Sequence, residues 1–186
     1  MVTKIDKLKA GHAEIQGETI AKFELFEQGF NPYSRYLDVD KVDLVLRKRS
    51  RSKISYFEVQ VKYGRLYHVG SKREQELFDV TSWRFFRPNE FKDCHSNLFV
   101  AYVLSLPHPE AYKGDIFIFP AKDFHHLISS SIQGNSKKGP TRQVLFSRAL
   151  NDGKWYMRTR KKFTKVEFTD ATIPIQQYWR NFDILK

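Results

Sequence analysis

Two neighbouring segments, residues 42–48 and 53–63, alternate between apolar and polar positions, the second more sharply than the first. In the second segment Phe57, Val59 and Val61 face one way, whereas Glu58, Gln60 and Lys62 face the other. Because successive side chains of a strand point to opposite faces, this alternation predicts two strands that each bury one side. The charged link RKRSRS predicts that they form a hairpin, and no proline prevents either strand from being central.

Other stretches predict the rest of an α/β fold. Apolar residues three and four positions apart predict a helix over residues 11–29, ending at Gly29. The remaining expected elements are a strand at 31–36, a turn at 38–41, a helix at 73–80, strands at 98–106 and 114–120, a helix at 121–132, a loop at 133–140, strands at 143–148 and 154–160, and a closing helix at 173–182. This order predicts a mixed central β-sheet flanked by helices, with a β-rich C-terminal extension. We expect a core domain at residues 1–132 and a basic extension at 133–186 packed on it.

The composition favours a folded protein. Hydrophobic residues make up 41% of the chain and aromatic residues 15%, enough apolar surface to exclude a disordered protein. The single cysteine, Cys94, excludes an internal disulfide and a cysteine-rich zinc module. No apolar run reaches the roughly 18 residues that a bilayer span needs, and the N-terminal stretch is polar. We therefore expect a soluble, cytoplasmic protein with no membrane partner.

The charge favours a polyanionic partner. Thirty-two Lys and Arg residues against 21 Asp and Glu residues give a net charge of +11, which points to nucleic acid ahead of membrane surfaces and acidic proteins. Cations gather in the link 47–53 and in residues 137–165, where aromatic residues are interleaved with them. The candidate DNA contacts are Arg47, Arg49, Arg51, Arg158, Arg160, Lys161 and Lys162. The competing interpretation is that such cations protect strand edges and hairpin tips from aggregation.

Four polar residues form a candidate site: Glu18, Asp43, Gln60 and Lys62. If the two alternating strands pair as a hairpin, Asp43 lies beside residues 58–62 on the same face, and Glu18 joins them from the border of the helix's apolar stripe. Buried polar groups are costly unless they are paired or bind an ion. Carboxylate and amide oxygens suit Mg²⁺ (or Mn²⁺), and an ammonium group stabilises charge that develops on a phosphate.

The stretches GETIAKFELFEQGF, VDLVL and YFEVQVKYGR resemble the PD-(D/E)XK nuclease superfamily, over about 55 of the 186 residues. They are most similar to the Q-x-K branch that includes group I intron-encoded homing endonucleases. The resemblance implies an αβββαβ restriction-endonuclease-like core and catalytic roles for Glu18, Asp43, Gln60 and Lys62, with Asp43, Glu18 and Gln60 holding the metal. Two features depart from the pattern: Val42 replaces the proline of the superfamily's name, and Gln60 carries no charge.

These observations predict a metal-dependent endodeoxyribonuclease with site-specific, homing-like or restriction-like cutting as its narrower form. Because one active site cuts one strand, double-strand cleavage favours a homo-oligomer, a dimer or a tetramer. The alternatives are a Holliday-junction or repair nuclease on the same core, a non-catalytic nucleic-acid-binding module with a decayed site, and a protein-interaction domain. Glu58, on the same face as Gln60, is a rival for the acid position.

Other chemistry-bearing residues predict no further site. His125 and His126 are adjacent and point apart on a helix, and Cys94 has no partners at metal-ligand spacing. We therefore expect neither a zinc site nor a cysteine nucleophile. The aromatic residues of the segment WRFF, Trp83, Phe85 and Phe86, are expected to lie in the core rather than to form a stacking surface.

Overall fold

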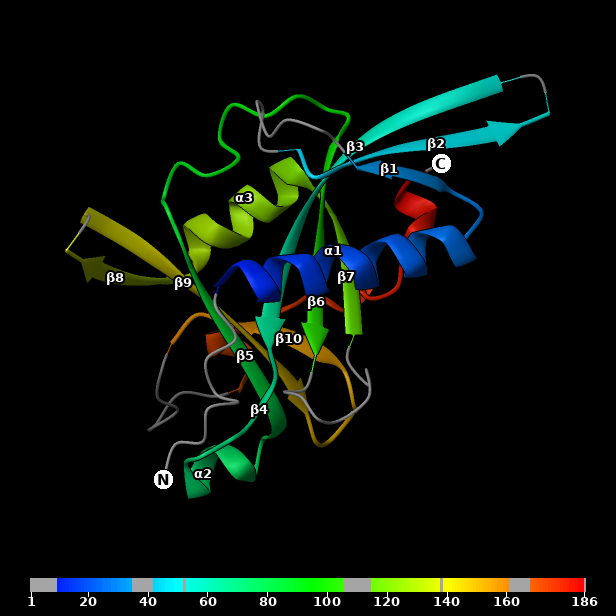
Figure 1. Cartoon of the computed structure of the whole chain (residues 1–186). Coiled ribbons are helices and arrows are strands. Elements are labelled where there is room, and N and C mark those ends of the chain that lie inside the picture. The colour runs from blue at the N-terminus through cyan, green and yellow to red at the C-terminus, as the bar shows by residue number, and fades with distance from the viewer. Residues whose placement is uncertain are drawn as a thin grey trace.

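The structure is a computed structural model that describes residues 10–34, 42–51, 53–105, 115–137, 139–160 and 168–185. Two β-sheets pack face to face with helix α3 beside them, and helix α1 covers the outer face of the first sheet (Figure 1). The helices are α1 (Ala10–Glu27), α2 (Lys72–Gln75) and α3 (Ala121–Ser130). None of the helices in the described part of the chain is both long and apolar enough to cross a membrane.

The first sheet is mixed and has the strand order β1-β2-β3-β6-β7. Strands β1, β2 and β3 form an antiparallel meander, β6 runs parallel to β3, and β7 runs antiparallel to β6. The strand bounds are β1 (Asn31–Ser34), β2 (Leu44–Ser50), β3 (Lys53–Arg65), β6 (Leu98–Ser105) and β7 (Asp115–Pro120). The connection from β3 to β6 contains α2 and two strands of the other sheet.

The second sheet has the order β11-β10-β9-β5-β4, with β8 also paired to β9, and all its pairings are antiparallel. Its strands are β4 (Tyr67–His68), β5 (Phe78–Phe86), β8 (Ile132–Ser136), β9 (Gly139–Ala149), β10 (Trp155–Arg158) and β11 (Thr172–Pro174). The expected domain boundary falls between residues 132 and 133. Strands from both sides of that position therefore belong to this one sheet.

Opposite faces of the first sheet build two hydrophobic cores. Residues Val59 and Leu44 pack under α1, where Ala21 and Leu25 are fully buried. The other face of β6 and β7 packs against α3 and the second sheet. Helix α1 ends at Glu27, and Gly29, the residue predicted to stop it, follows with a φ of 79°, a conformation that glycine adopts at little cost.

The expected mixed α/β architecture with a mixed sheet is confirmed. Three local predictions are wrong. Residues 133–136 belong to β8 and residues 139–140 to β9, which pair with each other, so these residues are not a loop. Residues 73–80 contain the last three residues of α2 and the start of β5. Residues 173–182 contain the end of β11 and the 3₁₀ turn Gln176–Tyr178 rather than a helix. Strand pairing decides the backbone at β8, β5 and β11, and the periodicity within each segment does not register that pairing.

Candidate functional site

A cavity of about 250 Å³ opens where β2 begins, between α1 and the adjoining edge of β3. It contains all four residues of the predicted site. Its lining residues are Glu14, Glu18, Ser34, Val42, Asp43, Gln60, Val61, Lys62, Tyr63 and Arg84. The structure therefore brings the predicted residues of α1, of β3 and of the position just before β2 to one hollow.

The register of the β2–β3 hairpin explains how Asp43 reaches the cavity. Leu44 pairs with Val59, so Asp43, one residue earlier, lies opposite Gln60 and on the same face. The Asp43 N–H donates a hydrogen bond to the Val59 carbonyl at 3.0 Å. The expected placement of Asp43 beside residues 58–62 thus follows from the pairing of the two strands.

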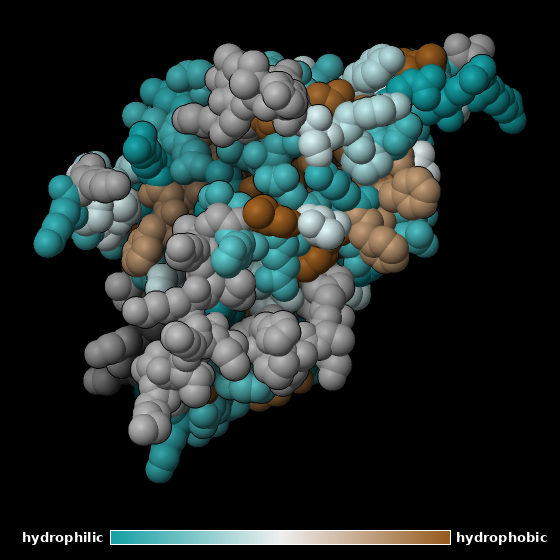
Figure 2. All heavy atoms as spheres, in the orientation of Figure 1, coloured by the Kyte–Doolittle hydropathy of each residue, from teal (hydrophilic) through white to brown (hydrophobic). Residues whose placement is uncertain are grey.

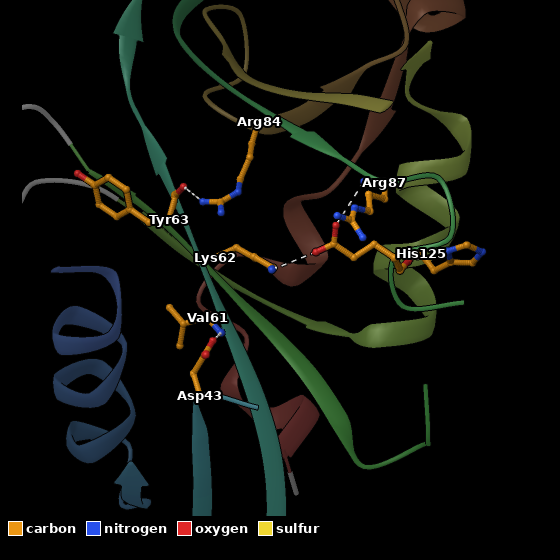
Figure 3. Close-up of polar contacts among 8 residues, drawn as sticks. Asp43, Val61, Lys62, Tyr63, Arg84, Arg87 and His125 are labelled. Carbon is orange, nitrogen blue, oxygen red and sulfur yellow. Dashed lines mark hydrogen bonds and ion pairs between the residues drawn. The ribbon is translucent and has the colours of Figure 1, made fainter. Parts of the chain in front are cut away.

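Side chains complete the hydrogen bonding of the β3 edge beyond Asp43 (Figure 3). The Val61 N–H donates to Oδ2 of Asp43, and Nη1 of Arg84 donates to the Tyr63 carbonyl at 2.7 Å. In an ordinary sheet the backbone of a neighbouring strand would satisfy these groups. Here an aspartate and an arginine do so, and both charged side chains line the cavity.

Close packing of α1 on β3 carries Glu18 to the cavity. A Cβ at Gly17 would lie only 3.0 Å from Cβ of Tyr63, closer than side chains ordinarily approach. The absence of a side chain at Gly17 lets the helix lie against the strand at this point, and the next residue is Glu18, which is half-buried. Glu14, one turn earlier, is exposed at the rim.

A second close approach positions Arg84. A Cβ at Gly64 would lie 2.6 Å from Oγ of Ser82, so β5 crosses β3 in near contact just beyond the cavity. Arg84 follows two residues later on the same face of β5. Nearby, burial raises the pKa of Tyr102 well above its ordinary value, so this phenol stays protonated.

Lys62 turns its amino group away from α1 and towards the segment that follows β5 (Figure 3). Its Nζ lies 3.0 Å from Oε1 of Glu90. Glu90 is held in turn by the Arg87 N–H, which donates to Oε2 at 3.3 Å, and by Nδ1 of His125, which lies 3.0 Å from the Glu90 carbonyl oxygen. Lys62 therefore belongs to the cavity while its charge is paired with a carboxylate that the sequence motifs did not indicate.

Gln60 and Lys62 also line a second hollow of about 440 Å³, together with Arg87, Asn89 and Glu90. Gln60 and Lys62 therefore lie between two hollows, one that contains Asp43 and one that contains Glu90. Gln60 is buried, and its position opposite Asp43 is the one that the motif predicts for the acid-position residue.

The rival residue Glu58 has different surroundings. It lies opposite Val45, and its Oε2 is 2.9 Å from Nε2 of His95. Glu58 does not line the cavity that holds Asp43. The geometry therefore favours Gln60 over Glu58 as the residue that accompanies Asp43.

The hairpin cations share a face with the candidate site. Arg47 and Arg49 lie two and three alternations along β2 from Asp43, so they project from the same side of the sheet. Arg51 is exposed at the turn. Figure 1 shows this hairpin extending beyond the body of the molecule, and Figure 2 shows hydrophilic side chains along it.

The predicted C-terminal contacts have different outcomes. Arg158 is buried in the second sheet, where Nη2 lies 2.7 Å from Oε1 of Glu74, so its prediction as a DNA contact is wrong. The cause is strand pleating, which points Arg158 inward. Arg160 is exposed, and Lys161 and Lys162 lie outside the described residues.

A metal ion at this site would have few ligands from the described residues. Among the described residues, no group of three or more His, Cys, Asp and Glu side chains is placed to hold one. The cavity instead offers the carboxylates of Glu18 and Asp43 and the amide oxygen of Gln60. That set fits Mg²⁺, which commonly takes one or two carboxylates and completes its shell with water and substrate phosphate. Away from this site, burial raises the pKa of the Cys94 thiol, which weakens it as a nucleophile.

Comparisons of the chain with models of protein families, with curated proteins and with solved structures find no match.

Proposed function

We propose that this protein is a metal-dependent endonuclease that hydrolyses phosphodiester bonds of DNA. The observation that carries the proposal is the convergence of Glu18, Asp43, Gln60 and Lys62 on one cavity. These residues come from three elements and are separated by up to 44 positions in the chain, so their meeting requires the fold. A half-exposed face that only happened to carry polar residues would not draw Glu18 from the helix to the same hollow.

The topology of the first sheet supports the same proposal. A helix precedes an antiparallel meander of three strands, and β6 then returns parallel to β3, an arrangement compatible with the αβββαβ order that the resemblance implies. The departure lies in the crossover, which contains the short α2 and strands of the second sheet in place of a long helix. The insertion is the source of Arg84 and Glu90, so it contributes to the site.

The two sides of the cavity have separate tasks in this proposal. Asp43 and Glu18, with the amide oxygen of Gln60, would hold a divalent ion, Mg²⁺ or Mn²⁺. When bound, such an ion supplies positive charge against the phosphate and makes a water molecule more acidic. Arg84 lines this cavity, and Lys62 extends from it to the adjoining hollow beside Glu90, so a phosphate at the border of the two hollows would meet both cations, which stabilise the charge that develops there.

The reaction is a displacement at phosphorus. A water oxygen forms a bond to phosphorus as the bond to one ester oxygen breaks, and a proton from the water passes to the departing oxygen. The products are one hydroxyl end and one phosphate end. Glu90 fixes the direction of the Lys62 ammonium group through their ion pair, so its role is to position Lys62.

The β2–β3 hairpin provides a path for the DNA backbone. Arg47 and Arg49 lie on the face that carries Asp43, and Arg51 extends the cationic surface to the turn. Phosphate contacts of this kind orient a duplex without reading its sequence. Double-strand cleavage further requires two active sites, which we propose come from two copies of the chain.

The test is cleavage of supercoiled plasmid DNA in Mg²⁺, compared with a chelator. The wild type should nick the plasmid only with the metal, and Asp43→Ala and Lys62→Ala should abolish nicking while retaining DNA binding. Glu27→Ala, an exposed acid at the far end of α1, is the matched control and should cut normally. Normal cutting by both cavity variants, or DNA binding without cutting by the wild type, would overturn the proposal.

A further inference from the structure

Three aromatic side chains, Tyr67, Trp83 and Phe85, form an exposed cluster on β4 and β5, which we name the aromatic platform. Between 39% and 50% of each side chain is exposed. The rings of Tyr67 and Trp83 are stacked at 6.3 Å and 15°, and Phe85 meets Trp83 edge-on at 5.6 Å. The expectation that Trp83 and Phe85 lie in the core is therefore wrong, and only Phe86 of that segment is buried.

The platform lies on the strand that supplies Arg84 to the candidate site. Trp83 and Phe85 flank Arg84 in the sequence, so they project from one face of β5 while Arg84 projects from the other into the cavity. Strand β4 pairs only with Val80 and Thr81 of β5. In the described part of the chain, β4 therefore does not cover the β5 edge at residues 82–86. This part of β5 lies between the cavity on one of its faces and the platform on the other.

The surroundings of the platform are cationic. Three segments carry or flank it, residues 63–73, 82–88 and 132–147, and they contain no Asp or Glu. Besides Arg84, which projects from the other face, their cations in the described part of the chain are Arg65, Lys72, Arg73, Arg87, Lys137 and Arg142. Of the acids that border these segments in the sequence, Glu74, Asp79 and Glu90 are ion-paired with Arg158, Arg148 and Lys62, and Glu76 is exposed. This charge is complementary to a polyanion and not to an apolar protein partner.

We propose that the aromatic platform binds unpaired bases of a single-stranded nucleic acid by stacking. Aromatic side chains with cations around them are the combination that such strands require, because the rings stack on the bases while the cations attract the phosphates. The inference deepens the proposed function and rests on it in taking nucleic acid as the ligand. It specifies a substrate with single-stranded character beside the cavity, such as a branch, a flap or an opened duplex.

The test is binding of labelled 15-nucleotide DNA, the same RNA sequence and a 15-base-pair duplex, each measured in a chelator so that no cleavage occurs. Trp83→Ala and Phe85→Ala should each weaken single-strand binding by about fivefold or more, the lower end of the energy of stacking on one base. Duplex binding should change less than twofold. Phe23→Ala removes a comparably exposed aromatic side chain from α1 and should bind all three ligands as the wild type does.

Tryptophan fluorescence gives a second readout that does not depend on the alanine variants folding. Single-stranded DNA should quench the wild-type emission, and the conservative Trp83→Phe variant should lose most of that quenching, because Trp155 is buried and Trp179 lies on another part of the chain. Stronger binding of the RNA or of the DNA identifies the source of the bases and supports the inference in either case. Equal single-strand binding by Trp83→Ala, Phe85→Ala and Phe23→Ala overturns it.

Failure of this inference is distinguishable from failure of the nuclease proposal. A wild type that binds single strands through Trp83 but never cuts DNA in Mg²⁺ would retain the platform and refute the nuclease. If the wild type cuts DNA and the platform variants bind single strands normally, the nuclease proposal is kept and the platform inference is refuted.

Discussion

Two ion pairs of the same chemical kind lie in different parts of this molecule. Nζ of Lys62 is 3.0 Å from Glu90, and Nη2 of Arg158 is 2.7 Å from Glu74. Each cation also lies over a phenylalanine ring, at 5.7 Å from Phe91 for Lys62 and 5.2 Å from Phe78 for Arg158.

Their surroundings separate the two pairs. The Lys62 and Glu90 side chains are 12% and 21% exposed, and Lys62 lines two hollows. The Arg158 side chain is 2% exposed and lies within the second sheet. An ion pair beside a solvent-filled hollow can exchange partners with a ligand, whereas a closed pair serves the packing of the fold. We therefore expect the Lys62 pair to govern activity and the Arg158 pair to govern stability.

The largest expected effect is on stability, at Arg158. Arg158→Met leaves Glu74 without its buried partner, and we expect the free energy of unfolding to fall by about 3–5 kcal/mol, the usual cost of breaking such a pair. Urea denaturation measures this change. The double variant Arg158→Met/Glu74→Gln should recover part of the loss. A fall below about 1 kcal/mol would show that the pair is not structural.

Removal of Lys62 should reduce DNA cleavage strongly and stability only slightly. Lys62→Ala should lower the rate of DNA cleavage at least about 100-fold, as loss of a group that stabilises transition-state charge does. Its unfolding free energy should fall far less than that of Arg158→Met, since Glu90 borders a hollow and can be hydrated. Single-turnover cleavage and urea denaturation of the same preparation give both values. A variant that is unstable but cuts normally would reverse the assigned roles.

Glu90 sharpens the comparison, because its proposed task is to direct Lys62. Glu90→Gln should lower kcat about tenfold and leave the Kd for DNA unchanged, within the range of losses seen when a positioning partner is removed. Glu90→Asp should restore part of kcat because it keeps the charge. A change in Kd alone would assign Glu90 to DNA binding instead.

The smallest expected effect is at the hairpin. Arg49→Ala and Arg51→Ala should each weaken DNA binding a few fold, uniformly across sequences, and each should lower the slope of log K against log salt by about 1. Filter binding from low to moderate salt measures the slope. An Arg158→Lys variant that remains folded should keep the wild-type slope, and a reduced slope there would place Arg158 in contact with DNA.

The sequence predicts the site better than it predicts its surroundings. Asp43 and Gln60 are brought together by a hairpin, which is local, so alternation along β2 and β3 is enough to place Asp43 on the face of Glu58, Gln60 and Lys62. The register of the structure then places it opposite Gln60. Glu18 follows from the helix periodicity and from Gly17, which permits the close approach of α1. These relations are short in range or encoded in a motif.

Arg84, Glu90 and Arg158 were beyond such reasoning for a shared physical reason. Each has neighbours set by the packing of β5, β9 and the segment after β5 against the first sheet, and no periodicity of the local sequence encodes that packing. The charge of Arg158 suits a surface and a buried pair equally well, and only the pairing of β9 with β10 turns it inward. The pairing of β5 with β9, which lie far apart in the chain, likewise leaves Trp83 exposed.

The most direct test of the central claim is a Mn²⁺ titration of the protein, followed by electron paramagnetic resonance, with Mn²⁺ as the divalent ion. The Lys62→Ala variant is used with bound DNA, because it should hold the DNA without cutting it. The account predicts one bound ion, whose affinity falls at least about tenfold when Asp43→Asn or Glu18→Gln is added. The same protein with Glu58→Gln should bind the ion unchanged. Equal Mn²⁺ binding with and without the Asp43 and Glu18 carboxylates would contradict the account.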